Sequence, residues 1–201
     1  MGLKQRAVAW VKDDPFGVEF AEIDLASNDL SARGVAIAGG PVSYRLDYTL
    51  QTAADFVTSR LHVVSRGEGW RREIELLRDG QGTWKLRTEE EGSVDLPAPG
   101  GDPAGFADAL DCDLGLSPVT NLMPVLRHGL LSGGDAFQLT AAWVSVPDLG
   151  VQADGQRYDF VSADHDQRVI RYEAVDGSFT ADIRVDGDGI VIDYPGIARR
   201  L

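Results

Sequence analysis

Hydrophobic and polar residues alternate with a period of two along most of the chain. Residues 43–50 show the pattern most clearly, because every even position there is Tyr or Leu and every odd position is polar. Side chains on a β-strand point alternately to opposite faces, so this pattern predicts a strand with one buried and one solvated face. Residues 178–185 repeat the pattern, with apolar residues at the odd positions.

Turn signals divide this alternation into about a dozen short strands. Asp79-Gly80 and Asp176-Gly177 are typical of tight turns between antiparallel strands. The spacing of roughly 8–12 residues is typical of an all-β barrel or sandwich. The expected strands are residues 7–11, 18–25, 33–38, 43–50, 57–66, 70–78, 83–88, 137–146, 156–163, 167–175, 178–185 and 190–194. Helix is expected only in short pieces near 103–110 and 117–127, and residues 89–92 and 96–105 are expected to be loops.

Length and charge narrow the possible classes of protein. We expect one domain over residues 1–201, because all-β barrels of this length commonly fold as one unit. No apolar run approaches the roughly 18 residues that span a bilayer, and the N-terminus does not resemble a signal peptide. The single cysteine, Cys112, cannot form an internal disulfide, which fits a cytoplasmic protein. A net charge of −13 argues against nucleic acid or an anionic membrane as a partner.

Residues 109–127 form the one long segment that reads neither as an alternating strand nor as a solvated turn. Two acids, an amide and a terminal arginine lie there among apolar residues and two prolines. One cysteine and three scattered histidines do not make a zinc-binding pattern, so no metal or other cofactor is predicted. Acids on both sides of Cys112 suppress its thiolate, and a buried structural cysteine is therefore expected rather than a nucleophile.

The polar residues of this segment have two interpretations. Asp111 and Asp113 are two residues apart, which places both carboxylates on one face if the segment is a strand. If the two carboxyls face a cavity, one of them would have a raised pKa and serve as a general acid. Otherwise the two carboxylates brace the turn or bond to Arg127. Asn121 and Arg127 would either bind the polar head of a ligand or, for Arg127, form a structural ion pair. The sequence leaves these alternatives open.

Aromatic residues supply further candidate ligand contacts. Trp10, Trp70, Trp84 and Trp143 all lie in predicted strands. Together with the tyrosines they either line a sugar- or lipid-binding cavity or fill the core. Arg72 shares a strand face with apolar residues, which is an unusual environment for a guanidinium.

The central segment carries a family resemblance. Residues 111–127 contain Asp-x-Asp-Leu, then Pro-x-Thr-Asn-x-x-Pro, then Arg, which resembles the core motif of the bacterial putative glycolipid-binding family, formerly a domain of unknown function. Trp143-Val-Ser-Val-Pro147, Gln156-x-Tyr158 and residues 185–195 also fit, so the resemblance covers essentially the whole chain. Met123 stands where the motif often has Leu.

The resemblance implies a cytosolic bacterial protein with a spirally curled antiparallel β half-barrel, similar to the lipoprotein-carrier fold, with an apolar cavity. We therefore expect non-enzymatic binding of a small amphiphilic molecule such as a glycolipid. The alternatives are a hydrolase that uses Asp111 or Asp113 as acid or base, and a β scaffold for protein partners. The sequence does not specify an oligomeric state. The candidate ligand-binding residues are Asp111, Asp113, Asn121, Arg127, Trp143, Tyr158, Trp10 and Arg72.

Overall fold

The computed structural model describes residues 2–201, which form a single large β-sheet with a few short helical turns. The strands are β1 (Lys4–Lys12), β2 (Gly17–Leu25), β3 (Leu30–Ala38), β4 (Tyr44–Thr52), β5 (Thr58–Gly67), β6 (Trp70–Arg78), β7 (Trp84–Gly92), β8 (Asp111–Leu114), β9 (Phe137–Val144), β10 (Val151–Asp164), β11 (Gln167–Ala174), β12 (Thr180–Asp186), β13 (Val191–Tyr194) and β14 (Ala198–Arg200). The helical pieces are η1 (Ala54–Phe56), η2 (Pro103–Phe106), α1 (Leu122–Arg127) and η3 (Leu130–Ser132).

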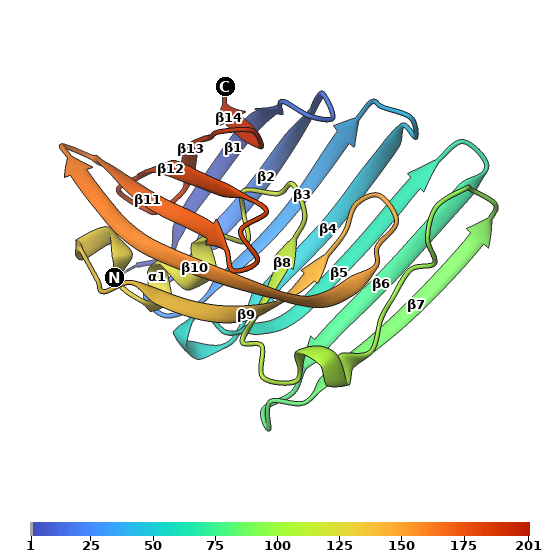
Figure 1. Ribbon diagram of the computed structural model, residues 1–201, viewed down its shortest axis with the longest axis horizontal. Helices are drawn as coiled ribbons and strands as arrows, with labels where there is room; N and C mark the ends of the chain where they lie inside the picture. The colour runs from blue at the N-terminus through green and yellow to red at the C-terminus, as the bar shows by residue number, and fades with distance from the viewer. Residues whose placement is uncertain (1) are drawn as a thin grey trace.

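Nearly every strand pairs with its neighbour along the chain. The order across the sheet is β7-β6-β5-β4-β3-β2-β1-β14-β13-β12-β11-β10-β9-β8, so the first and last strands of the chain meet in its middle. Trp10 of β1 lies opposite Arg200 of β14, and only the β8–β9 pair is parallel. The sheet curls without closing, as Figure 1 shows, and β7 and β8 are its two edges. The prediction of a mainly antiparallel, curled half-barrel is confirmed.

Some element boundaries differ from those expected. The structure has 14 strands, because β8 and β14 were not in the expected set and each is only three or four residues long. Residues 89–92 were expected to be a loop, but they continue β7. Glu90 and Glu91 of β7 lie opposite Arg72 and Arg71 of β6, so cross-strand charge pairing supports a segment whose composition suggested a turn.

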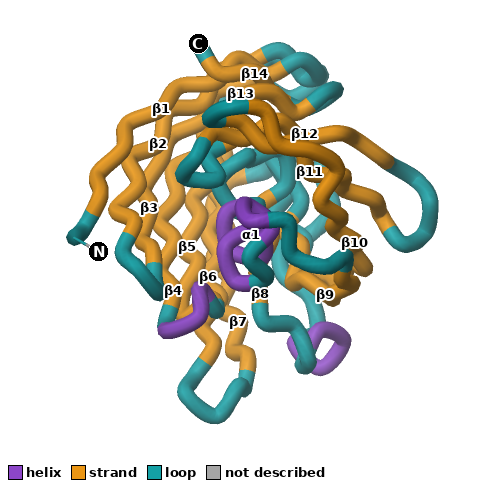
Figure 2. The backbone as a smooth tube through the Cα atoms, turned by 90° about the vertical axis from the view of Figure 1, so that its left-hand side faces the viewer, coloured by secondary structure: helices purple, strands orange, loops and turns teal. Residues whose placement is uncertain are grey.

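The hollow of the curled sheet is occupied by the chain itself. Figure 2 shows β8 and α1 lying between the arc formed by β1–β7 and the facing strands β9–β12. The Thr58 N–H of β5 donates to the Leu110 carbonyl (3.0 Å), and the Cys112 N–H donates to the Thr58 hydroxyl (2.9 Å). Leu122 and Met123 of α1 pack in the same hydrophobic cluster as the inward side chains of β1–β6. Residues 109–127, the segment that stood out in the sequence, therefore fill the concave side of the half-barrel.

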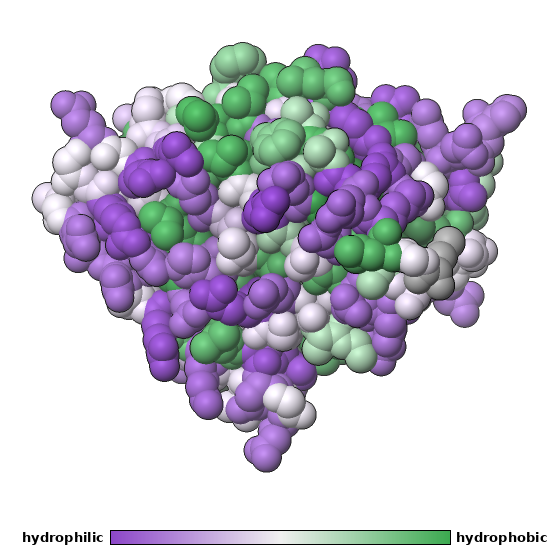
Figure 3. Space-filling view, turned by 180° about the vertical axis from the view of Figure 1, so that it is seen from behind, coloured by the Kyte–Doolittle hydropathy of each residue, from purple (hydrophilic) through white to green (hydrophobic). Residues whose placement is uncertain are grey.

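Period-two alternation decides which side chains face this filling. In β4, Tyr44, Leu46, Tyr48 and Leu50 are at most 4 % exposed, whereas the residues between them face outwards. The outer face of this half of the sheet, seen from behind in Figure 3, is largely hydrophilic, with hydrophobic residues between the polar ones. Burial of one face by β8 and α1 therefore fixes the register of these strands.

A long connection joins the two edges of the sheet. The segment between β7 and β8 crosses to the β9–β10 hairpin, where Gly100 forms a parallel bridge with Gly150. The buried guanidinium of Arg72 donates to the carbonyls of Pro97, Asp148 (3.2 Å) and Leu96 (3.3 Å). Arg72 thus holds this connection against the sheet, which explains a charged residue on an otherwise apolar strand face.

Candidate functional site

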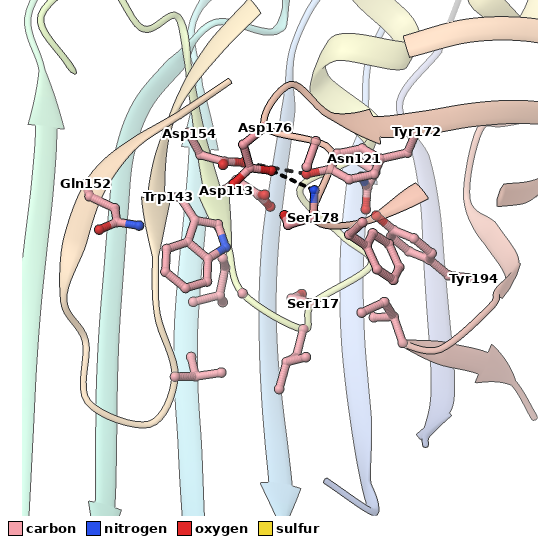
Figure 4. A pocket seen from close by; sticks show the side chains of 17 residues that line it. Asp113, Ser117, Asn121, Trp143, Gln152, Asp154, Tyr172, Asp176, Ser178 and Tyr194 are labelled. Carbon is pink, nitrogen blue, oxygen red and sulfur yellow. Dashed lines mark hydrogen bonds between the residues drawn. The ribbon is translucent and has the colours of Figure 1, made fainter. Parts of the chain in front are cut away.

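A pocket of about 480 Å³ lies between the β8–α1 segment and the strands β9–β13. Figure 4 shows carboxylate groups gathered at one end and aromatic rings on either side. The lining residues are Asp113, Leu114, Gly115, Leu116, Ser117, Asn121, Trp143, Val146, Gln152, Asp154, Tyr172, Ala174, Asp176, Ser178, Phe179, Tyr194 and Ile197. This volume lies within the range typical of small-molecule sites, roughly 300–1,000 Å³.

The pocket floor is the tight turn between β8 and α1. Leu116 adopts a left-handed conformation there (φ 63°), which is strained for a residue with a branched side chain. The buried Lys12 ammonium donates to the Leu116 carbonyl (2.7 Å) and pairs with Glu19 (2.7 Å). Glu19 also accepts hydrogen bonds from Ser117 (2.6 Å) and Tyr48 (2.8 Å). A buried polar network contributed by β1, β2 and β4 therefore fixes the strained turn from behind.

Asp113 and Asp154 form the polar end of the pocket. The Gln156 amide Nε2 donates to both carboxylates, at 2.7 Å from Asp113 and 2.9 Å from Asp154, so these two groups lie side by side. The Thr120 hydroxyl donates to the other oxygen of Asp113 (2.7 Å). Burial raises the pKa of Asp113, because the dry surroundings penalise its charged form more than the two hydrogen bonds favour it. Asp176 lies at the exposed rim.

Aromatic side chains, among them Trp143, Tyr172 and Tyr194, form the walls. Trp143 of β9 lies opposite Tyr172 and Tyr194 in Figure 4, and the two tyrosine rings contact each other with centroids 6.1 Å apart. Burial raises the pKa of both tyrosines well above its usual value, so their hydroxyls stay protonated at neutral pH. The Tyr172 hydroxyl reaches Asp154 at 3.5 Å. Flat apolar surfaces beside hydrogen-bonding groups suit the ring of a sugar.

Asp111 and Arg127 form an ion pair away from the pocket lining. Two guanidinium nitrogens of Arg127 bond to the two oxygens of Asp111, one at 2.7 Å, and the side chains are only 11 % and 3 % exposed. The pair joins the start of β8 to the end of α1. Asn121 lines the pocket, and its amide donates to the buried Tyr158 hydroxyl (3.0 Å). Tyr158 does not line the pocket itself but holds Asn121 in place from behind the pocket wall.

The structure does not bring the remaining candidates to this pocket. Trp10 is fully buried, and its indole N–H donates to the Val191 carbonyl (2.9 Å). Trp70 and Trp84 are buried in the cluster on the other side of β8 and α1. Arg72 supports the connection between the sheet edges, as described above. Of the four tryptophans, Trp143 alone lines the pocket.

Cys112 and the acids show no sign of a metal or thiolate centre. Burial raises the pKa of the Cys112 thiol far above its usual value, which keeps the thiol protonated and unreactive. Among residues 2–201, no group of three or more His, Cys, Asp and Glu side chains is arranged to hold a metal ion. None of the helices in that range has the length and apolar composition needed to span a bilayer.

Comparison with known proteins gives a family. The family model described as "Putative glycolipid-binding" matches residues 7–200. The chain belongs to this family. A crystal structure of a DUF1089 family protein from Pseudomonas aeruginosa is similar to this family member, with a TM-score of 0.70 and 29 % sequence identity over 91 % of this chain and 92 % of that one. No curated protein matches the chain.

In this glycolipid-binding family member, sequence reasoning missed several pocket residues. Asp154 and Asp176 were not among the candidates. Gln156, which binds both Asp113 and Asp154 without lining the pocket, was noted only as part of the resemblance. A signal for Asp154 was present: Asp154, Gln156 and Tyr158 are two residues apart, so they share one face of β10. Asp176 lies in a turn, whose position relative to the pocket depends on the curl of the whole sheet.

Proposed function

We propose that this protein binds an amphiphilic ligand, a glycolipid, without chemical change, and that the pocket described above receives the sugar head group. The observation that carries this proposal is a cavity with aromatic walls and a polar end, as polyhydroxylated rings require. The sugar ring would stack on Trp143, and its hydroxyls would donate to Asp113 and Asp154. The family description supports this assignment.

The filled half-barrel defines where an acyl chain would lie. The concave face of β1–β6 is packed against β8 and α1. Apolar contacts remain at the pocket itself, where Leu116, Val146 and Ile197 are part of the lining. The start of an acyl chain would rest on these residues, and each buried methylene would contribute about 0.8 kcal/mol.

The same geometry disfavours the hydrolase alternative. Both oxygens of Asp111 bond to Arg127, and both oxygens of Asp113 accept hydrogen bonds from neighbouring side chains. The Asp111 carboxyl is therefore not available to a substrate as a general acid or base, and Asp113 is held in the pocket as a hydrogen-bond acceptor. The single buried and protonated Cys112 supports a reducing compartment, and we place the protein in the cytoplasm.

Binding of n-octyl β-D-glucopyranoside below its critical micelle concentration tests this proposal. Isothermal titration calorimetry would compare it with an octyl polyethylene glycol ether, which has the same chain but no sugar. We expect the glucoside to bind at least about tenfold more tightly, a difference of ~1.4 kcal/mol. Replacing Trp143 with Ala should remove that preference, because the stacking surface is lost.

A control variant separates loss of the pocket from loss of the fold. Phe16 is 73 % exposed in the turn after β1 and does not line the pocket, so Phe16→Ala should bind the glucoside like the unchanged protein. Thermal unfolding of both variants would show that they remain folded. Equal affinity for the two detergents, or full binding by Trp143→Ala, would contradict a sugar-binding pocket.

A further inference from the structure

The pocket has an uncompensated negative charge. Asp113, Asp154 and Asp176 all line it, whereas none of the described lining residues is Lys, Arg or His. None of the three takes part in an ion pair within residues 2–201, although most other buried or half-buried acids of the sheet do. The groups that donate to Asp113 and Asp154 are neutral amides and hydroxyls.

The positively charged side chains Lys12 and Arg127 on neighbouring elements already pair with other carboxylates. Lys12, behind the pocket floor, is paired with Glu19 and bonded to a backbone carbonyl. Arg127, at the end of α1, is held by both oxygens of Asp111. Neither side chain lines the pocket. Within residues 2–201, no positively charged side chain lines the pocket to balance these carboxylates.

Like charges in a poorly hydrated site repel each other, and each loses hydration when water is excluded. A ligand that carries a positive charge would offset both costs, while a phosphate or sulfate would increase them. Unlike the indole nitrogens of Trp10 and Trp84, which donate to carbonyls, that of Trp143 has no partner within residues 2–201. Figure 4 shows this nitrogen turned towards the centre of the pocket, so a donor is left for the ligand.

The aromatic walls add a second attraction for a cation. Trp143, Tyr172 and Tyr194 lie around the carboxylates, and an ammonium seated over the face of one of these rings gains cation–π stabilisation. From this arrangement we infer that the pocket selects a sugar head group bearing a free amino group, with the ammonium beside Asp154 and Asp113. This inference deepens the proposed function and rests on it.

Three octyl glycosides test the selectivity. Octyl β-D-glucopyranoside, its 2-amino-2-deoxy analogue and the N-acetylated form of that analogue have the same chain and ring. The titrations are made at about pH 6.5 and low salt, where the amine of the analogue is protonated. We expect the amino glycoside to bind at least about tenfold more tightly than the other two, and the difference to shrink as salt is added.

Two matched Asp→Asn variants on one strand locate the effect. Asp154 and Asp159 both lie on β10, but Asp159 faces outwards, with a side chain 44 % exposed, and is absent from the pocket. Asp154→Asn should lower the affinity for the amino glycoside about tenfold with little change for the glucoside. Asp159→Asn should change neither, although it alters the net charge equally.

The outcomes separate this inference from the proposed function. Equal affinities for all three glycosides would overturn amine selectivity while sugar binding stands. An amine preference that survives in Asp154→Asn would also overturn it, because the attraction would then come from the net charge of the molecule. No binding of any glycoside to the unchanged protein would overturn the proposed function itself, and the selectivity with it.

Discussion

At the scale of single residues, burial and pairing decide what each charged group of the central segment does. Asp111 and Asp113 are two residues apart and carry the same group, yet one is bound by Arg127 and the other faces the pocket. The sequence could not separate these roles, because either carboxylate could have reached Arg127, and Gln156, which binds Asp113, lies far along the chain on β10. The sequence left two roles open for Arg127, a contact with the ligand or a structural ion pair. Its pairing with Asp111 supports the ion pair.

Replacing Arg127 with Met tests this role of the ion pair. The change leaves the Asp111 carboxylate, 3 % exposed, without its cation. Breaking a buried pair in this way costs about 3–5 kcal/mol, because an uncompensated charge remains in the interior. Urea unfolding would measure the loss.

The matched control is Arg171→Met on the outer face of the sheet. Arg171 pairs with Asp182, and both side chains are nearly half exposed. Solvent screens such a pair, so its loss should cost far less than the loss of the buried pair. A similar small cost for Arg127→Met would show that the Asp111 pair contributes little, and would return Arg127 to the candidate ligand contacts.

At the scale of elements, the sequence predicted the alternating strands better than the position of β8 and α1 inside the half-barrel. Strands such as β4 and β12 alternate cleanly, because one face meets the core and the other meets water. The burial of residues 111–114 does not alternate, although their polarity does, because β8 is covered on several sides and three of its four residues are buried. The sequence marked this segment as unusual, but its place inside the sheet depends on contacts with β5 and β9.

The pocket was predicted only in part for the same reason. Asn121, Asp113 and Trp143 were candidates and line the pocket, since the central motif and the tryptophans drew attention to them. Asp154 and Asp176 were missed, because acids in a hairpin strand and a turn usually face solvent. Only the curl of the sheet, which no local pattern specifies, places them opposite the central segment.

The Thr58 hydroxyl of β5 bonds to Cys112 of β8, and it also lies within donating distance of the sulfur atoms of Cys112 and Met123. The Thr58 hydroxyl accepts from the buried Cys112 N–H, so Thr58→Val leaves that donor without a partner. We expect a loss of about 1–3 kcal/mol in the free energy of unfolding, the usual cost of an unsatisfied buried group. Chemical denaturation would measure it.

Thr49→Val provides the same substitution at a site with no such bond. The Thr49 hydroxyl is buried and has no hydrogen-bond partner within the described chain, so its removal should be neutral or slightly stabilising. Equal losses for the two variants would indicate that the Thr→Val exchange itself, and not the Cys112 bond, determines the effect.

At the scale of the whole molecule, the strand order makes the half-barrel a nearly continuous meander. β1 pairs with β14, and the Leu201 N–H donates to the Ala9 carbonyl (2.9 Å), so the end of the chain lies beside its first strand. The sheet edges are instead formed by β7 and β8, which are consecutive in sequence. The connection between them is therefore the natural place for chain ends, because neighbouring strands would remain neighbours along the chain.

A circular permutant tests this view of the fold. Gly2 and Leu201 would be joined by a flexible Gly/Ser linker of about ten residues, enough to run alongside β1 at ~3.3 Å per residue. New ends would be opened between Pro97 and Ala98, both exposed. We expect the permutant to keep its β-sheet circular dichroism and its binding of octyl glucoside, since every strand pair is preserved.

A second permutant opened between Gly115 and Leu116 would free the strained turn that Lys12 holds, and it should lose binding even where it folds. Loss of the sheet in the first permutant, with retention in the second, would mean that the 93–102 connection and not the β8–α1 filling holds the half-barrel together.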